Sequence, residues 1–193
     1  MPTENEKKYV LTLDCHTEIV KNSVAAFEIL QGYVASKNGM TARIRSSRKV
    51  GKERRKHHFC FKYKVTSRLI EIEKKIDQRD YDDLWEIALN KIWKIRYNLL
   101  LNTRRGEEHL WEVDFFLDED GKVYFAMAEF EMEEGKLAPD FVPPIISKHV
   151  VFEVPLNDGR FSSRKLSNQQ YASTLLEMLG VRSCLDNKPL NTL

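Results

Sequence analysis

Charged side chains recur in pairs, two residues apart, along most of the chain. Side chains of an extended strand alternate between its two faces, so a pair at i and i+2 shares one face. Apolar residues such as Ile44 and Val113 hold the alternate positions in most of these stretches. The pattern predicts a sheet with one charged and one apolar face. The paired residues are Glu4 and Glu6 with Lys8 on the same face, Arg43 and Arg45, Lys62 and Lys64, Glu71 and Glu73, Lys94 and Arg96, Glu112 and Asp114, and Glu129 and Glu131.

The two kinds of charge suit two different partners. Arginine donates forked hydrogen bonds to phosphate oxygens, and lysine supplies a compact positive charge. Carboxylates hold hard divalent cations through their oxygens. The alternative is an ordinary antiparallel sheet whose charged face meets water. Threonine, serine and glutamine are nearly absent from the charged face, which favours an interior that holds water and ions, since unpaired charges in a dry core are costly.

Turns and helices must position these strands. The dipeptide Asn38-Gly39 predicts a tight hairpin turn between two of them. Residues 77–91 carry apolar side chains at helical spacing and predict a helix that connects two halves of the sheet. A short apolar strand is expected over residues 150–154. A last amphipathic helix is expected over about residues 168–179, packed on the outside of the sheet.

The motifs around the charged pairs, in their order, resemble those of the CYTH domain, or triphosphate tunnel metalloenzyme, family. The opening strand with Lys8 resembles the Glu-x-Glu-x-Lys signature of that family, and the resemblance extends over about residues 4–166. One departure is Ile70, where the family has an arginine; Arg68 or Arg160 is a candidate replacement. The further similar stretches are residues 30–34 (Gln-Gly-Tyr-Leu in the family), 42–45 (Val-Arg-Val-Arg), 70–73 (Arg-x-Glu-Tyr-Glu), 94–97 (Lys-Thr-Arg-Tyr), 111–115 (Trp-Glu-Val-Asp-x-Phe) and 127–131 (Leu-Ala-Glu-x-Glu).

The resemblance implies an α+β fold: a closed eight-stranded antiparallel β-barrel, or triphosphate tunnel, with flanking helices, in one domain over residues 1–193. Family members hydrolyse inorganic tripolyphosphate, thiamine triphosphate, nucleoside triphosphates or RNA 5′-triphosphate ends, or cyclise ATP, and need Mg²⁺ or Mn²⁺. The motifs look more like those of the small triphosphatases, so a divalent-metal-dependent triphosphatase is expected. A class IV adenylate cyclase and a non-catalytic polyphosphate- or nucleotide-binding protein are the alternatives.

The same resemblance implies separate roles for the charged residues. The expected catalytic residues are Lys8, Glu6 and Arg45. The expected metal ligands are Glu4, Glu6, Glu129 and Glu131. The expected phosphate-binding residues are Lys8, Arg43, Arg45, Lys62, Lys64, Lys94 and Arg96; the family has one lysine where this chain offers Lys62 and Lys64. The expected supporting carboxylates of the tunnel are Glu71, Glu73, Glu112 and Asp114.

Composition fits one globular domain. The 193 residues are 42% hydrophobic and 31% charged, which is enough for one well-buried core. A net charge of +2 gives no reason to expect general binding to nucleic acid or a membrane. The expected partner is a small-molecule triphosphate, and the chain is expected to be a monomer or homodimer. Cys15, Cys60 and Cys184 lack paired spacing and read as free thiols. Without a signal peptide or membrane-spanning run, a cytoplasmic location is expected.

Overall fold

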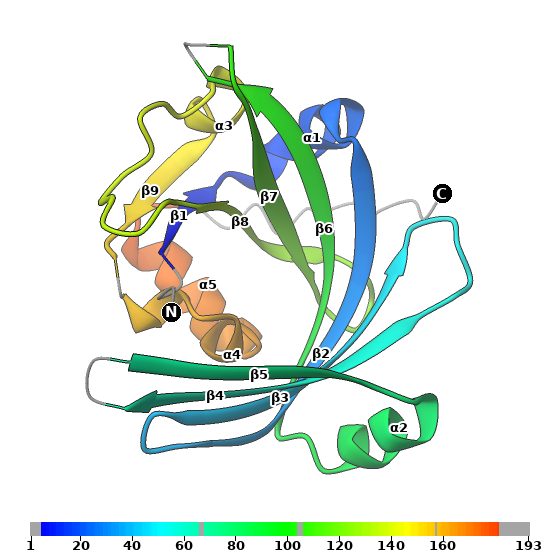
Figure 1. Ribbon diagram of the computed structural model, residues 1–193. Coiled ribbons are helices and arrows are strands. Elements are labelled where there is room, and N and C mark those ends of the chain that lie inside the picture. Colours follow the sequence, from blue (N-terminus) through cyan, green and yellow to red (C-terminus); the bar gives the residue numbers. More distant parts are fainter. Residues whose placement is uncertain (1–4, 66–67, 104–105, 157, 182–193) are drawn as a thin grey trace.

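The computed structural model describes residues 5–65, 68–103, 106–156 and 158–181. They form a nine-stranded antiparallel sheet in the order β5-β4-β3-β2-β6-β7-β8-β1-β9 (Figure 1). The strands are β1 (Glu6–Leu11), β2 (Ala25–Lys37), β3 (Met40–Lys49), β4 (Lys56–Val65), β5 (Arg68–Ile76), β6 (Asn90–Asn102), β7 (Glu108–Leu117), β8 (Val123–Glu131) and β9 (Val150–Val154). The helices are α1 (His16–Asn22), α2 (Gln78–Glu86), α3 (Pro144–Ser147), α4 (Ser163–Leu166) and α5 (Gln169–Met178), with 3-10 turns η1 (Leu13–Cys15) and η2 (Gly159–Phe161).

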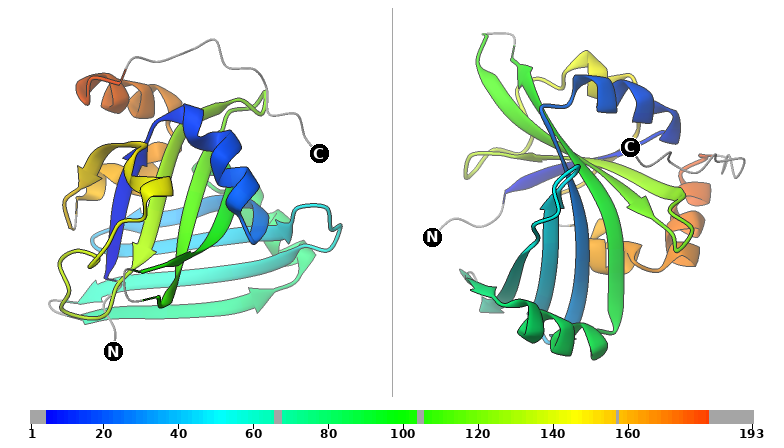
Figure 2. Two further views of the ribbon diagram at one scale, coloured as in Figure 1. Left: turned by 90° about the horizontal axis from the view of Figure 1, so that it is seen from above. Right: turned by 90° about the vertical axis from the view of Figure 1, so that its right-hand side faces the viewer.

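The sheet is strongly curled but open. Each edge strand, β5 and β9, pairs with a single neighbour in the described part of the chain, so no ladder joins the two edges. Figure 2 shows the arm formed by β3, β4 and β5 turned away from the strands at the other edge. The predicted closed eight-stranded barrel is therefore wrong: the sheet has nine strands and two free edges. The physical reason is that α4 and α5 occupy space between the arms, where side chains of α5 pack against β8.

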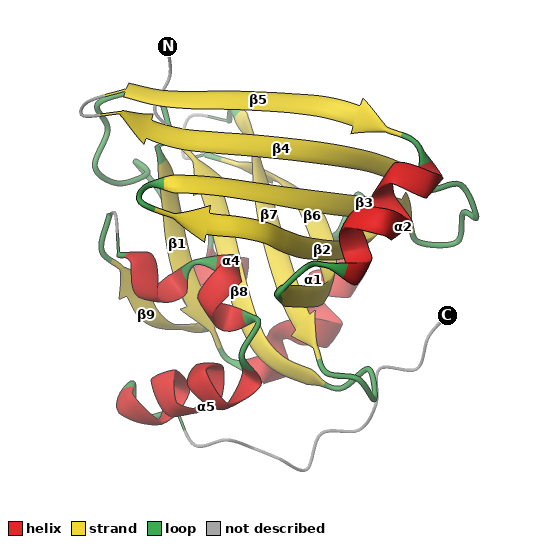
Figure 3. Ribbon diagram, turned by 90° about the horizontal axis from the view of Figure 1, so that it is seen from below, coloured by secondary structure: helices red, strands yellow, loops and turns green. Residues whose placement is uncertain are grey.

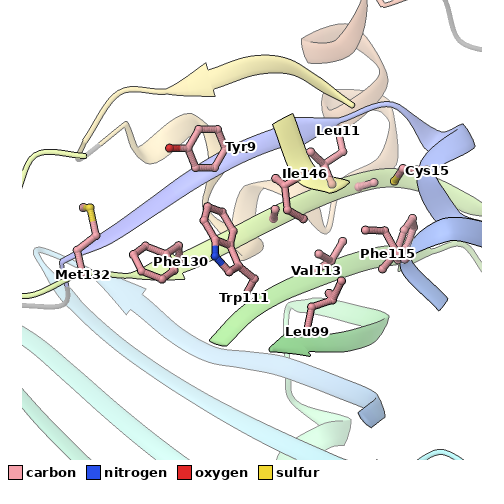
Figure 4. Close-up of a cluster of buried hydrophobic side chains, with 13 residues drawn as sticks. Tyr9, Leu11, Cys15, Leu99, Trp111, Val113, Phe115, Phe130, Met132 and Ile146 are labelled. Atoms are coloured by element: carbon pink, nitrogen blue, oxygen red, sulfur yellow. The ribbon is translucent and has the colours of Figure 1, made fainter. Parts of the chain in front are cut away.

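One apolar core lies on the convex face of the sheet, beneath α1 and α3 (Figure 4). Trp111 and Phe130 stack with ring centroids 4.7 Å apart. Val113 and Phe115 are completely buried in the same cluster. Burial of such side chains contributes about 1.5–3 kcal/mol each. The prediction that these four residues point away from the charged face is confirmed.

A second core fills part of the concave face. Val10 and Met127 of the sheet pack there with Phe161 of η2 and with Leu175 and Leu176 of α5. The concave face is thus apolar where α4 and α5 cover it and charged beyond them. The charged part is the region left for a site.

Local signals set the turns and helix ends. Asn38 and Gly39 have φ angles of 51° and 77°, which are the left-handed angles of a two-residue hairpin turn, so the predicted turn is confirmed. The Asp77 carboxylate caps α2 by accepting a hydrogen bond from a backbone amide. The helix ends at Glu86, earlier than predicted, and a short turn leads from it to the start of β6 at Asn90. No helix within the described ranges combines the length and apolar character needed to span a bilayer.

Candidate active site

The uncovered part of the concave face forms a cavity of ≈ 1390 Å³. Charged side chains from six strands line it, and most of them belong to the pairs recognised in the sequence. The predicted site residues that line the cavity are Glu6, Lys8, Arg43, Arg45, Lys62, Lys94, Arg96, Glu112, Glu129 and Glu131. The structure therefore brings together side chains from both ends of the sheet order.

The other predicted residues lie elsewhere. Glu71 and Glu73 are exposed on the edge strand β5, and Asp114 is completely buried behind the cavity lining. Glu4 and the side chain of Lys64 fall outside the described residues. The free edge explains the position of the β5 carboxylates, because no strand beyond β5 shields them from water.

Of the two candidate replacements for the missing family arginine, Arg160 does not line the cavity. Arg160 follows β9 and pairs with Asp158 at 2.6 Å, in an exposed turn. The side chain of Arg68 lies outside the described residues. Position 70 therefore remains a genuine departure from the family pattern within the described chain.

Carboxylates gather where β1 pairs with β8. Glu6 lies opposite Glu131, and Lys8 lies opposite Glu129. The Lys8 ammonium is 3.1 Å from Glu6 and 3.0 Å from Glu129. Burial alone would raise the pKa of Glu129, but nearby Lys8 and Arg96 hold it well below its usual range. We call Glu6, Glu129 and Glu131 the acidic wall.

Arg96 occupies the centre of the cavity among three carboxylates. Its guanidinium lies 2.6 Å from Asp114 and 2.7 Å from Glu129, and it also pairs with Glu112. Asp114 in turn accepts a hydrogen bond from Lys94. Burial lowers the pKa of Lys94 to about 8, because the cost of desolvation outweighs the attraction of the neighbouring carboxylate. The centre of the site is thus a buried ion network that already satisfies its charges.

Strands β3 and β4 present Arg43, Arg45 and Lys62, which we call the cationic wall. Arg45 donates from Nε and Nη2 to the side-chain oxygen of Gln31, at 3.1 and 3.0 Å. It forms no ion pair with a carboxylate of the described residues. Burial and repulsion from neighbouring arginines lower the pKa of Arg45. Arg45 is therefore a half-buried cation whose hydrogen bonds among the described residues go to a neutral partner, while Asp114 and Glu73 attract it without forming an ion pair.

Sequence reasoning missed several cavity residues. Gln31 was given no predicted role; it is buried behind the cavity lining, accepts hydrogen bonds from Arg45 and donates one to the hydroxyl of Tyr33, which does line the cavity, at 2.9 Å. Both residues lie in the stretch compared with the Gln-Gly-Tyr-Leu motif, so a signal was present without a role. Arg164 and Lys165 of α4 also line the cavity. They lie on a helix, and a search for pairs on strands could not find them.

The acidic wall has donors that fit a divalent cation. Mg²⁺ and Mn²⁺ prefer carboxylate oxygens as ligands. Glu6 and Glu131 face each other across the β1–β8 ladder, and both line the cavity. Glu129 adds a third carboxylate, which it shares with Lys8 and Arg96. The donor types of the acidic wall therefore suit the metal that the resemblance implied, although oxygens of all three carboxylates do not lie within 4.8 Å of one another.

A second group of donors fits such a metal less well. One ligand atom each of Cys60, Glu71 and Glu73 lies within 4.8 Å of the others. Burial raises the pKa of the Cys60 thiol, which donates to Glu71 at 3.4 Å. A protonated, soft sulfur is a poor ligand for a hard cation.

Comparisons with known proteins give a fold-level likeness of low similarity. No family model matches the chain, and none of the curated proteins matches it. The PH1819 protein from Pyrococcus horikoshii OT3 is 16% identical with a TM-score of 0.47, over 95% of this chain and 96% of that one. A Bacillus halodurans protein named as a proposed adenylate cyclase is 9% identical with a TM-score of 0.40, over 92% and 90%. At these scores the matches establish neither the family nor the activity of this chain.

Proposed function

We propose that this chain is a divalent-metal-dependent phosphoric anhydride hydrolase that cleaves a triphosphate in the cavity, in the manner of the small triphosphatases of the triphosphate tunnel family. The substrate is inorganic tripolyphosphate or an organic or nucleoside triphosphate. The cationic wall binds the phosphates, and the acidic wall holds Mg²⁺ or Mn²⁺. The sequence motifs and the grouping of their charges around one cavity both support this function.

The observation that carries the proposal is the setting of Arg45. A desolvated guanidinium costs free energy unless an anion compensates its charge. Among the described residues Arg45 donates its hydrogen bonds to the Gln31 oxygen, and the attraction of Asp114 and Glu73 does not offset its burial and the repulsion from neighbouring arginines. A polyphosphate would supply the missing charge through forked hydrogen bonds. An ordinary solvated sheet face gives no reason to hold a half-buried cation without an ion pair to a described carboxylate.

The residues of the chain then divide the work of catalysis. Arg45 with Arg43 and Lys62 would bind the phosphate oxygens and offset the charge that develops on them in the transition state. Lys8 lies between two carboxylates and can donate to a phosphate oxygen close to the acidic wall. The buried network around Arg96 would keep this arrangement rigid, so little reorganisation accompanies the reaction.

Metal binding falls to the acidic wall in this proposal. Glu6 and Glu131 would hold the cation, with Glu129 as a further oxygen donor and Glu4 as an expected ligand outside the described residues. A cation bound there would polarise the phosphoryl group or lower the pKa of an attacking water. Retention of three carboxylates beside a phosphate site favours a hydrolase over simple capture of an anion, because capture gains nothing from added negative charge.

The direct test is a product screen with purified protein. Tripolyphosphate, ATP, GTP and thiamine triphosphate would each be incubated with Mg²⁺ or Mn²⁺, and released phosphate and nucleotide products measured, with Arg45→Ala as the inactive control. We expect orthophosphate release from at least one substrate, abolished by removal of metal. Cyclic AMP with pyrophosphate would identify a cyclase instead. Tight metal-free binding without turnover of any substrate would identify a non-catalytic binding protein and overturn the proposal.

A further inference from the structure

The face of β3, β4 and β5 that points away from the cavity is apolar. The antiparallel register aligns its side chains in cross-strand rows. Ile72 is 57% exposed and Tyr63 is 39% exposed, which is unusual for large apolar residues gathered on one face. Two lysines of this face border these rows: Lys74, one row further along β5, and Lys37, beside Met40 on β2. We call the following residues the outer patch: Met40, Tyr63 and Ile70 in one row, and Ala42, Phe61 and Ile72 in the next.

No helix of the described chain covers the outer patch. Figure 3 shows α2 crossing one end of this arm while the rest of β4 and β5 stays bare. None of the patch residues belongs to either buried core. Strand β5 is also an unpaired edge. Exposed apolar surface beside an open edge marks an interaction site.

We propose that the outer patch is the interface of a symmetric homodimer, in which two copies of this chain pack these faces against each other. A two-fold interface uses one surface twice, so that surface must complement itself. The apolar rows meet this condition, because a second copy brings no charge to the centre of the contact. Ile72 and Phe61 of one copy would meet the same rows of its partner, in the manner of two stacked sheets.

In the proposed dimer, charged residues at one end of the patch are opposite in sign to those at the other end. At one end α2 exposes Asp82, Asp83 and Glu86. At the other end, Lys37 is exposed in the row of Met40, on the same face. A two-fold axis that sets the strands of the two copies antiparallel places the acidic end of one copy over the lysine end of the other. A parallel stack would instead oppose like charges.

The size of the patch sets the expected strength. Stable interfaces bury about 800 Å² on each partner, and α2 already covers part of this three-stranded face. We therefore expect a reversible dimer with a dissociation constant of roughly 1–50 µM. The proposal does not depend on the proposed catalytic function, because the outer patch and the cavity lie on opposite faces of β3 and β4.

Sedimentation velocity of the full chain between about 1 and 200 µM tests the proposal. Wild type should pass from monomer to dimer over this range. Ile72→Lys should raise the dissociation constant at least tenfold, because it places two lysines in an apolar interface. Val24→Lys is the matched control: Val24 is also 57% exposed, but it precedes β2 near α1. Melting temperature should be nearly unchanged in both variants.

Several results would overturn the proposal. One is a wild-type chain that stays monomeric at the highest concentration. Another is a dimer that tolerates Ile72→Lys as well as Val24→Lys. A shortened chain that ends at residue 181 tests whether the last residues of the same chain cover the patch. If the shortened chain dimerises and the intact chain does not, residues 182–193 are the occupant and the homodimer is wrong for the intact protein.

Discussion

Arg96, beside the acidic wall, and Arg45, on the cationic wall, have opposite surroundings, whereas Lys62 of the cationic wall pairs with Glu71 at 3.2 Å. On the acidic wall, Glu129 lies within ion-pair distance of both Lys8 and Arg96. On the cationic wall, Arg45 has only the neutral Gln31 as its hydrogen-bond partner. The same residue type thus has two settings: Arg96 is surrounded by carboxylates, whereas Arg45 is not. The comparison suggests that Arg96 builds the site and that Arg45 acts on the ligand.

Energetics support this division. Removing one member of a buried ion network leaves the others uncompensated, which is strongly destabilising. Removing a half-buried cation that forms no ion pair with a described carboxylate relieves part of an electrostatic cost in the unliganded protein. Stability and catalysis should therefore respond differently to the two arginines, and the following experiments measure that difference.

The largest expected effect is on folding, in Arg96→Ala. Loss of this guanidinium leaves Asp114 and Glu129 buried with fewer cations, which should cost about 3–5 kcal/mol and lower the melting temperature by roughly 10 °C. Thermal unfolding followed by circular dichroism would measure it. Arg45→Ala is the matched control and should melt within about 2 °C of wild type. Equal destabilisation of the two variants would remove the distinction between the walls.

Arg45→Ala should reduce turnover strongly while leaving the melting temperature almost unchanged, in contrast to Arg96→Ala. Loss of a preorganised donor to the transition state typically costs about 10²–10³ in kcat. Steady-state kinetics at saturating metal, with the substrate found in the product screen, would measure the loss. Arg45→Lys should recover part of the activity, because it keeps the charge but not the fork. Near-wild-type turnover in Arg45→Ala would exclude this residue as a principal phosphate ligand.

Glu6→Gln tests the acidic wall. The amide keeps the shape and one acceptor oxygen but removes the charge that a hard cation favours. Turnover should fall roughly tenfold or more, with the Mn²⁺ dependence moved to higher concentration. Calorimetric affinity for tripolyphosphate without metal should persist or increase, since one repelling charge is gone. The melting temperature should hardly change. If turnover and metal dependence both match wild type, the metal site lies elsewhere.

The smallest expected effect is a pH dependence set by Lys94. Its pKa of about 8 is below the ordinary value of about 10.4, so the folded protein loses this proton as pH rises through 8. Metal-free affinity for tripolyphosphate should fall severalfold between about pH 7 and 9. Lys94→Met should flatten that change, and Lys122→Met, at an exposed turn, should not. An identical pH profile in Lys94→Met would assign the titration to another group.

The lowered pKa of Lys94 also makes the free energy of unfolding depend on pH. Between about pH 8 and 10.4 the unfolded chain keeps the Lys94 proton and the folded chain does not. The unfolded state then binds more protons, so the contribution of this group to the free energy of unfolding rises with pH in that window. Chemical denaturation at two pH values, compared with Lys94→Met, would isolate this contribution.

The sequence predicted the grouping of charges because alternation on a strand is a local property. The pairs Arg43 with Arg45 and Lys94 with Arg96 each lie on one face, as their spacing required. The apolar alternates of β7 and the Asn38-Gly39 turn followed from the same local rules. These features need no knowledge of distant partners, and they were predicted within a few residues of their observed bounds.

The remaining features depend on contacts between distant segments. Closure of the sheet is prevented by α4 and α5, whose packing against β8 is not encoded in any strand pattern. The contrast between Arg96 and Arg45 depends on cross-strand register: Asp114 lies opposite Arg96, whereas Gln31 lies opposite Arg45. The resemblance made both arginines phosphate ligands, with Arg45 also catalytic, and it contained no information on which partner lies opposite each of them.

The place of β1 between β8 and β9 also determines the route by which the site can assemble. The cationic wall comes from one hairpin, β3 with β4, whose residues are close in sequence and can pair early. The acidic wall joins Glu6 to Glu131 across most of the chain, and such distant pairing closes a long loop and is slow. During synthesis, β1 must wait unpaired until β8 and β9 have emerged from the ribosome. A nascent chain can therefore hold the positive half of its site well before the negative half exists.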